Sequence, residues 1–545
     1  MDKQKVAARP QRSAKELMLR GSAWMTAGSI LSRVLGAIYI IPWRIWLGAA
    51  YLTANSLFTK GYQIYNIFLI VSTAGVPGAI SKQIARYNAM NEYKTGMRLF
   101  YHGAVAMSIM GVVACGLLWV LAPVLALRDA ALTQVFRTLA WPLLLIPLLS
   151  VMRGFFQGYN EMAPSALSQF IEQVARVIYM LLMTYTIMVI GNHNYVDAVA
   201  QSTFAAFVGA VFGLLLLIGY FFHQRGRFAE LAASSSGNVH ISTKRILLEI
   251  AQQAFPFIVM GAATNLYYII DQYTFDPMML THYIVSKHAL GELYALFAGN
   301  ANKLIMIVVS LAVAMASTAL PLLAAAKTRG VGREIADNIT NILQLFFIVM
   351  IPSALGMAAV SQPLYVVFFG YDKLGISVME LSSFLAVFFG LFTVLASVLQ
   401  GLFHNRLAMK IMVVGVAVKF IFQWPLIVLF NVYGPTLATM LGMAASIALM
   451  LWQLRDLYHF KARQTLRRLV GITAFAVVMA VVVRVLVWLM SQVLNPASGM
   501  QSMLMLVVAL PIGVAIYAYA VLKTRLADLI IGRRIGSIRQ KLHIG

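Results

Sequence analysis

Long runs of apolar residues alternate with short polar segments along almost the whole chain. Most of these runs hold about 20 to 28 residues, the length of helix that crosses the roughly 30 Å hydrocarbon core of a bilayer. They are too long and too uniformly apolar for the alternating strands of a membrane barrel. The pattern predicts an all-α polytopic membrane protein with 14 transmembrane helices. We number them as spans 1 to 14: 22–48, 57–80, 98–126, 135–156, 163–190, 196–223, 246–275, 293–325, 337–360, 380–404, 406–431, 434–458, 467–493 and 500–522.

The composition agrees with this pattern, since 61% of the residues are hydrophobic and only 11% are charged. A net charge of +24 would indicate a nucleic-acid partner in a soluble protein. Here, with the N-terminus inside, 30 of the 42 cations fall in the segments that would be cytoplasmic, and about four fall outside. The charge therefore reports topology: we expect no nucleic-acid partner, and we expect both termini in the cytoplasm. The single cysteine allows neither a disulfide framework nor a thiolate metal site, and residues 1–20 lack the apolar core of a cleaved signal peptide.

Two segments of the chain recur about 245 residues later. SVMRGFFQ (150–157) resembles SVLQGLFH (397–404), and EQVARVIY (172–179) aligns with GVAVKFIF (415–422). Because the copies hold six spans each, both enter the membrane in the same direction, which predicts two parallel six-helix repeats and a C-terminal two-helix appendage. The predicted domains are a basic tail (1–21), an N-lobe (22–223), a cytoplasmic linker (224–245), a C-lobe (246–458), the appended spans (459–522) and a second basic tail (523–545).

Charged residues within the spans are the candidates for function. A cation at the bilayer centre costs at least about 2.5 kcal/mol, so it normally faces the bundle interior or a wet cavity. The span acids are few: Glu172, Glu249 and Asp271. The span cations are Arg33, Arg44, Lys60, Arg153, Arg176, Lys303, Lys419 and Arg484.

Four of these cations, Arg33, Arg176, Lys303 and Lys419, have about ten apolar-run residues on either side. Arg33 and Arg44 are eleven residues apart, which places them on one face of a helix at two heights of a cavity. Arg44 and Arg153 are also close enough to a span end to snorkel to the interface, and Arg484 could either snorkel or make a helix contact. Lys60, at the start of span 2, stays ambiguous.

The two repeats differ in their charges. Glu172 precedes Arg176 by four residues, the favourable order for an ion pair, so Arg176 is either a neutralised structural residue or a ligand. Its counterpart Lys419 has Gly415 in the place of that acid, and we expect it to be a bare cation. In span 7, Ala262 stands at the place of Arg33 and Asp271 at the place of Pro42.

An excess of buried cations predicts a central cavity for a phosphate or carboxylate ligand. Proton or sodium relays would need buried carboxylates, which are scarce, and no metal site is expected. The predicted anion-binding residues are Arg33, Arg44, Lys60, Arg176, Lys303 and Lys419, supported by Glu172, Asp271 and Arg153.

SRVLG (32–36), followed by an apolar run and read with the duplication, resembles the first helix of the MurJ/MviN family of lipid II flippases in the MOP superfamily of exporters. The whole chain is similar to the YtgP/SpoVB polysaccharide-biosynthesis branch of Gram-positive bacteria. Arg33 matches the essential arginine of the family motif. The chain departs from better-known members at Tyr39 and in YQIYNIF (62–68), where those proteins have further arginines.

The resemblance implies a transporter rather than an enzyme, in the bacterial cell membrane, that moves an undecaprenyl-diphosphate-linked saccharide to the outer leaflet by alternating access. Lipid II is the first candidate substrate, and spans 13 and 14 would flank a groove for its lipid tail. No cofactor is implied; a membrane potential or an ion gradient would supply the energy. The partners would be the lipid-linked substrate, membrane lipids and the cell-wall synthesis machinery, with the monomer as the functional unit.

Several other functions stay open. The substrate could be another lipid-linked polysaccharide or teichoic acid precursor. A multidrug or cation antiporter would need more acids in its cavity. A membrane transferase would use the external loop 276–292, with Asp276, His282, His288 and Glu292, while a passive scaffold would leave the buried cations unexplained.

Overall fold

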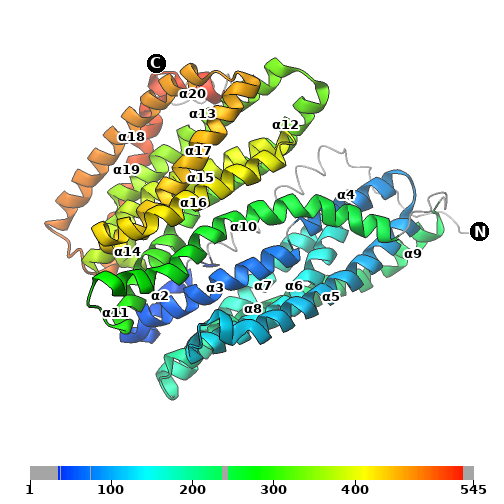
Figure 1. Cartoon of the computed structure of the whole chain (residues 1–545), viewed down its shortest axis with the longest axis horizontal. Coiled ribbons are helices and arrows are strands. Elements are labelled where there is room, and N and C mark those ends of the chain that lie inside the picture. The colour runs from blue at the N-terminus through cyan, green and yellow to red at the C-terminus, as the bar shows by residue number, and fades with distance from the viewer. Residues whose placement is uncertain (1–34, 37, 74, 236–242, 532–545) are drawn as a thin grey trace, which may run out of the picture. The chain divides into compact units, whose positions relative to one another are not determined.

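Every regular element that the computed structural model describes is a helix (Figure 1). The described residues are 35, 36, 38–73, 75–235 and 243–531, with side chains described except at 243–257, 260, 263, 321 and 531. Within this part of the chain, eleven helical stretches are long and apolar enough to cross a membrane. The all-α membrane class is therefore confirmed. The count of 14 stays a prediction: one stretch, Asn405–Tyr458, holds two of the predicted spans, and span 1 lies largely outside the described residues.

The described chain forms two compact units that share two helices. The first unit holds the residues up to Gly48 and Gly61–Ala262, and the second holds Ala49–Lys60 and the residues from Ala263 onward. As a result, α3 (Tyr51–Thr73) begins in the second unit and ends in the first, while α10 (Thr243–His282) does the reverse. The predicted domain boundaries, including the separate pair of spans at 459–522, stay predictions.

The first unit is built around α6. Its elements are α2 (Ile40–Leu47), the end of α3, α4 (Val76–Ala89), α5 (Tyr93–Leu125), α6 (Ala130–Gly158), α7 (Met162–Tyr185), the π-helical turn η2 (Thr186–Ile190), α8 (Tyr195–His223), α9 (Arg225–Ala233) and the start of α10. α6 packs against α4, α5 and α8, and α7 runs along α8. Buried aromatic rings fill one end of this core, where Phe155 lies 4.4 Å from Phe100 and 5.2 Å from Phe228 between ring centroids.

The second unit is built around α15. Its elements are the start of α3, the end of α10, α11 (Lys287–Tyr294), the π-helical η3 (Ala295–Ala301), α12 (Asn302–Arg329), α13 (Gly332–Ala359), α14 (Ser361–Phe369), α15 (Lys373–Gly401), α16 (Asn405–Phe430), the 3-10 turn η4 (Asn431–Tyr433), α17 (Gly434–Tyr458), α18 (Ala462–Ser491), α19 (Gly499–Lys523) and α20 (Leu526–Ile531). α15 packs against α12, α13 and α17, and α16 runs along α17. α18 packs on α13 and α19 packs on α14, so the appended pair, orange to red in Figure 1, covers α13 and α14.

Polar side chains set the starts of four helices. Asp129, Asn194, Ser286 and Asp372 each accept a hydrogen bond from a backbone N–H two or three residues later, at the starts of α6, α8, α11 and α15. Such a cap satisfies one of the four N–H groups that a helix start leaves without an intrahelical partner. All four caps are carboxylates, amides or hydroxyls at predicted external ends, where the sequence places few cations.

Each unit contains a helix crossing with no room for a β-carbon. A Cβ on Gly209 of α8 would lie 2.5 Å from the carbonyl oxygen of Glu172 on α7. A Cβ on Gly442 of α17 would lie 2.5 Å from the carbonyl oxygen of Gly415 on α16. Glu172 and Gly415 are aligned in the sequence repeat, so the two crossings place aligned residues in the same local contact.

A second pair of crossings has the same form. Gly154 of α6 faces the carbonyl oxygen of Pro77, which a Cβ would approach to 2.7 Å. Gly401 of α15 faces the carbonyl oxygen of Leu320 on α12, at 2.8 Å from a Cβ. Gly154 and Gly401 hold the same place in SVMRGFFQ and SVLQGLFH, so the repeated motif carries a close helix contact in each unit.

Candidate functional site

The predicted cations of span 1 are only partly within the described chain. Arg33, and with it the predicted face shared with Arg44, lies outside the described residues, as does the side chain of Glu249. Arg44 lies on α2 and is half-buried, and its Nε is buried without a hydrogen-bond partner among the described residues. A buried N–H of a guanidinium group without an acceptor is unusual in a folded protein. Arg44 therefore keeps a donor that an incoming anion could use.

Arg176 lies on α7 among tyrosine side chains. Its guanidinium donates a hydrogen bond to the hydroxyl of Tyr62 and lies 5.2 Å from the centre of that ring. Tyr62 in turn packs edge-on against Tyr65 at 5.6 Å, and Tyr39 is near enough to interact electrostatically with Arg176. The structure thus brings Arg176 to the two places, Tyr39 and 62–68, at which the sequence departs from the family's arginines. Sequence reasoning missed these tyrosines as partners of the charge.

Glu172 does not form the predicted ion pair with Arg176. Its Oε2 accepts a hydrogen bond from Arg153 of α6 at 2.6 Å, and Arg153 Nε also donates to Ser168 at 2.8 Å. The neutralised pair, one of the two alternatives for Arg176, does not form because a cation from the neighbouring helix pairs with the carboxylate. The side chain of Arg153 is part-buried between α6 and α7, so it does not snorkel to the membrane–water interface. Among the described residues, no carboxylate forms an ion pair with Arg176.

Lys419 is not the bare cation that the sequence predicted. Its ammonium lies 2.8 Å from both carboxylate oxygens of Asp271 on α10 and donates to Thr439 of α17 at 2.5 Å. Gln423 donates to the same carboxylate at 2.8 Å. The prediction failed because the acid comes from another helix, whereas only the position four residues earlier on α16 was considered.

Lys60 and Lys303 both lie in the second unit. Lys60 forms an ion pair with Asp276 at 2.9 Å and lies 4.8 Å above the ring of Tyr294. Lys303 of α12 donates to the side-chain oxygen of Asn55 at 2.6 Å and lies 5.1 Å from the centre of the Phe58 ring. Lys60 is thus neutralised by a carboxylate, while Lys303 donates to a neutral amide.

A buried network of neutral polar side chains surrounds Lys303. Asn300 accepts hydrogen bonds from Tyr51 at 2.8 Å and Asn55 at 2.7 Å, and it donates to Tyr365 at 2.8 Å. Asn300 lies in the π-helical η3, a form that is common at functional sites. Sequence reasoning missed this network because it considered only charged residues. The signal that could have found it is asparagine within long apolar runs, where an unsatisfied amide is costly.

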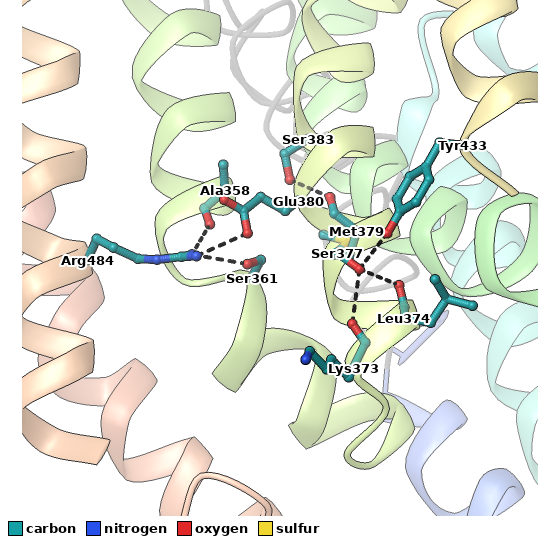
Figure 2. A network of polar contacts seen from close by, with 10 residues as sticks. All are labelled: Ala358, Ser361, Lys373, Leu374, Ser377, Met379, Glu380, Ser383, Tyr433 and Arg484. Carbon is teal, nitrogen blue, oxygen red and sulfur yellow. Dashed lines mark hydrogen bonds and ion pairs between the residues drawn. The ribbon is translucent and has the colours of Figure 1, made fainter. Parts of the chain in front are cut away.

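Arg484 is the span cation of the appended pair. It makes a helix contact, which is one of the two alternatives predicted for it. Figure 2 shows it reaching from α18 to the carbonyl oxygen of Ala358, to Ser361 and to Glu380 of α15. The Arg484–Glu380 distance is 3.1 Å, and both side chains are about half exposed. These contacts connect the appended α18 to α15 and to the break between α13 and α14.

The predicted external loop 276–292 is largely helical. α10 continues to His282 and α11 begins at Lys287. Asp276 is engaged by Lys60, and His288 lies 3.7 Å from Glu292 and 3.1 Å from Thr53. Within the described residues, no group of three or more metal-ligating side chains is gathered. Asp276 and His288 thus contact two residues of α3.

Comparison with known proteins assigns the chain to a class and to a family. A "Lipid II flippase MurJ" from Bacillus subtilis (strain 168) is 32% identical over 547 residues, which cover 97% of this chain and 99% of that protein. The chain is therefore a multi-pass membrane transporter rather than an enzyme. The model of the family described as "Polysaccharide biosynthesis protein" matches residues 18–327, and the chain belongs to that family.

Solved structures show the same fold. The "Lipid II flippase MurJ, inward closed conformation" matches with a TM-score of 0.60 over 91% of this chain and 97% of that one, at 11% identity. A multidrug resistance MATE transporter of the MOP superfamily, in an inward-facing conformation, matches with a TM-score of 0.57 over 80% and 99%, at 14% identity. The predicted resemblance to the MurJ family is confirmed by the 32% identity, and the chain has the fold of these solved structures.

Proposed function

We propose that this protein is a flippase that moves an undecaprenyl-diphosphate-linked saccharide, lipid II first among them, from the inner to the outer leaflet of the bacterial cell membrane. The observation that carries the proposal is the 32% identity to a lipid II flippase along nearly the full length of both chains. The excess of span cations supports it, since a diphosphate headgroup cannot cross hydrocarbon without polar partners.

The contacts divide the predicted cations into two groups. Lys60, Arg153 and Lys419 each face a carboxylate at 2.9 Å or less, which neutralises them. Arg176 instead donates to a tyrosine hydroxyl, and Arg44 keeps a buried N–H without an acceptor in the described chain. We assign diphosphate binding to Arg33, Arg44 and Arg176, which belong to the first unit, and helix positioning to the neutralised group; Lys303 stays a predicted anion ligand. A guanidinium suits this task because its planar N–H groups match two phosphate oxygens.

The transport cycle is proposed to be alternating access between two repeated lobes. The crossings at Gly209 and Gly442, and those at Gly154 and Gly401, support the repeat because aligned residues make matching contacts. Helix contacts correspond as well. α5 packs against α6 as α13 packs against α15, and α7 runs along α8 as α16 runs along α17. Since α3 and α10 each have residues in both units, we propose that these two helices bend during the cycle.

The direction and energy of transport are part of the proposal. With both termini in the cytoplasm, an inside-negative potential favours outward movement of an anion by about 2.3 kcal/mol per charge per 100 mV. We propose that this potential, or an ion gradient, drives the monomer without a cofactor, and that cell-wall synthesis enzymes receive the product.

Growth rescue tests the proposal. A bacterial strain depleted of its own lipid II flippase would receive the wild-type chain, Arg33→Ala, Arg176→Ala or the control Arg137→Gln, each quantified in the membrane fraction. Arg137 is a useful control because it lies over the Trp119 ring, 4.6 Å from its centre, near a predicted external end. We expect rescue by the wild type and the control only. A well-expressed wild-type chain that restores no growth would contradict lipid II as the substrate.

A second candidate keeps the mechanism and changes the substrate. The family description, "Polysaccharide biosynthesis protein", favours a precursor of another lipid-linked polysaccharide or of teichoic acid. Flipping assays in proteoliposomes with two undecaprenyl-diphosphate substrates, one carrying the lipid II headgroup and one a different saccharide, separate the two candidates. The substrate with the higher rate per reconstituted protein is the physiological class.

A further inference from the structure

A basic hollow lies where α17 turns into α18, outside the cavity proposed for the substrate. It has a volume of about 490 Å³, and four of the residues that line it are cations: Arg455, Lys461, Arg463 and Arg467. The positive-inside rule explains why such residues occur near a span end. It does not explain why they converge on one concave site.

The convergence follows from the local backbone. α17 ends at Tyr458, and His459 adopts a left-handed conformation, with φ of 50°, that reverses the chain. Phe460 is buried below the turn, and the backbone N–H of Lys461 donates to Thr340 at 3.2 Å. Arg463 and Arg467 are then one helical turn apart on the same face of α18, opposite Arg455 in the last turn of α17.

The charges around the hollow are only partly compensated. Lys461 forms an ion pair with Asp337 of α13 at 2.8 Å. The side chains of Arg455, Arg463 and Arg467 are exposed and make no ion pair or hydrogen bond with the described residues. The adjacent Arg468 points elsewhere, to Gln344 and to the carbonyl oxygen of Leu529. Three free guanidinium groups around one hollow favour a phosphate-bearing ligand.

Exposed apolar side chains close in sequence to these arginines indicate the source of that phosphate. Trp452, one turn before Arg455, and Leu466, next to Arg467, are each 61% exposed. The apolar run of α18 begins directly afterwards, at Leu469. Cations beside exposed apolar side chains at the start of a span match the level at which lipid headgroups meet acyl chains. A free inorganic anion would gain nothing from the exposed apolar side chains.

We propose that this hollow is a binding site for an anionic glycerophospholipid, with its phosphate among Arg455, Arg463 and Arg467 and its acyl chains along Trp452 and Leu466. The site is separate from substrate transport. The bound lipid would contact the turn that connects α17 to the appended α18.

Native mass spectrometry of the full chain in detergent tests the proposal. Dioleoylphosphatidylglycerol or dioleoylphosphatidylcholine is titrated into the wild type, into the hollow variant R455Q/R463Q/R467Q and into the control K82Q/R86Q/K94Q. The control removes the same charge from exposed cations on α4 and α5, at a predicted cytoplasmic face. We expect one phosphatidylglycerol to bind the wild type and the control about tenfold more tightly than phosphatidylcholine, and the hollow variant to lose this preference.

Two further arms complete the test. The variant W452A/L466A should weaken phosphatidylglycerol binding, and millimolar inorganic phosphate should leave phosphatidylglycerol binding to the wild type nearly unchanged. Equal losses in the hollow variant and the control would overturn the site, because general charge would then explain the binding. Displacement of the lipid by inorganic phosphate would overturn the lipid as the ligand. Size-exclusion profiles of the variants confirm that each is folded.

Discussion

The ammonium group of Lys419 lies 2.8 Å from both carboxylate oxygens of Asp271, although the two residues are 148 positions apart in the chain. The side chains of Lys419 and Asp271 are 0% and 5% exposed. Thr439 and Gln423 supply further hydrogen bonds to the pair, so protein atoms replace the water that both charges lose. One buried group of charges thereby connects α10, α16 and α17.

Removal of one member of this pair should destabilise the protein strongly. Lys419→Met leaves the Asp271 carboxylate buried without its counter-ion, and breaking such pairs typically costs about 3–5 kcal/mol. Thermal unfolding of the detergent-purified chain measures the loss as a lower midpoint. The double variant Lys419→Met/Asp271→Leu removes both charges and should regain most of the midpoint, because apolar pairs often replace buried ion pairs at little cost. A double variant as unstable as the single one would contradict this account.

The membrane helices could be predicted from the sequence because their determinant is local. A run of some 20 apolar residues has few alternatives to a helix, so the predicted spans within the described residues lie on helices, although span 2 (57–80) is divided between α3 and α4. The partner of Lys419 could not be predicted in the same way, since it depends on which helices pack together. Asp271 was identified as a buried acid, but its distance of 148 residues from Lys419 held no pairing signal.

Arg176 should be essential for transport if it binds the diphosphate. Arg176→Ala should abolish flipping of lipid II in proteoliposomes, and Arg176→Lys should lower the rate about tenfold, because an ammonium keeps the charge but loses the planar pair of donors. Tyr62→Phe, which removes the hydroxyl that accepts from Arg176, should have a smaller effect. Rates are normalised to reconstituted protein, with Arg137→Gln as the control. A wild-type rate for Arg176→Ala would exclude this residue as a ligand.

The surroundings of Arg176 show which ion pairs can be predicted from residue spacing along one helix. The i, i+4 rule correctly notes that Glu172 and Arg176 share a face of α7. It cannot include Arg153, which comes from α6 and takes the carboxylate at 2.6 Å. Charge spacing along one helix therefore identified charged side chains that lie close together but not their pairing, because a third charge on a neighbouring helix decided it.

The network of Asn55 and Asn300 should stabilise the second unit. Asn300→Leu removes the acceptor of two hydrogen bonds and the donor of a third, and each buried group left without a partner costs about 1–3 kcal/mol. We expect a lower unfolding midpoint for Asn300→Leu and for Asn55→Ala. The double variant should lower the midpoint by less than the sum of the two single losses, because the two amides are joined by one hydrogen bond.

A matched control for this prediction is Gln134→Ala. Gln134 also forms a side-chain hydrogen bond, to Asp197 at 3.0 Å, but that bond is exposed to the surroundings. Its loss should change the midpoint little, because water replaces the partner. Equal effects of Gln134→Ala and Asn300→Leu would show that burial of the network is not what stabilises the unit.

His404, in the turn between α15 and α16, should make stability depend on pH. Burial, and then the nearby charge of Lys327, lower the pKa of this histidine below its ordinary value of 6.5. Its Nε2 lies 2.8 Å from the hydroxyl of Tyr458, which also accepts from Lys327 at 3.1 Å, an arrangement that suits the neutral ring. Because the folded state binds this proton less readily than the unfolded state, stability should be full above about pH 6.5 and fall as the pH drops below it.

Unfolding midpoints at pH 8.0 and pH 5.5 measure this effect in the purified protein. His404→Gln should reduce the difference between the two midpoints, since a glutamine does not titrate. His223→Gln, at the exposed end of α8, is the matched control, because it removes a histidine and leaves the contact between His404 and Tyr458 in place. A pH response as large in His404→Gln as in the wild type would assign the effect to other groups. The sign is the decisive feature: a histidine that gained a favourable charged partner on folding would make the protein more stable, not less, as the pH falls.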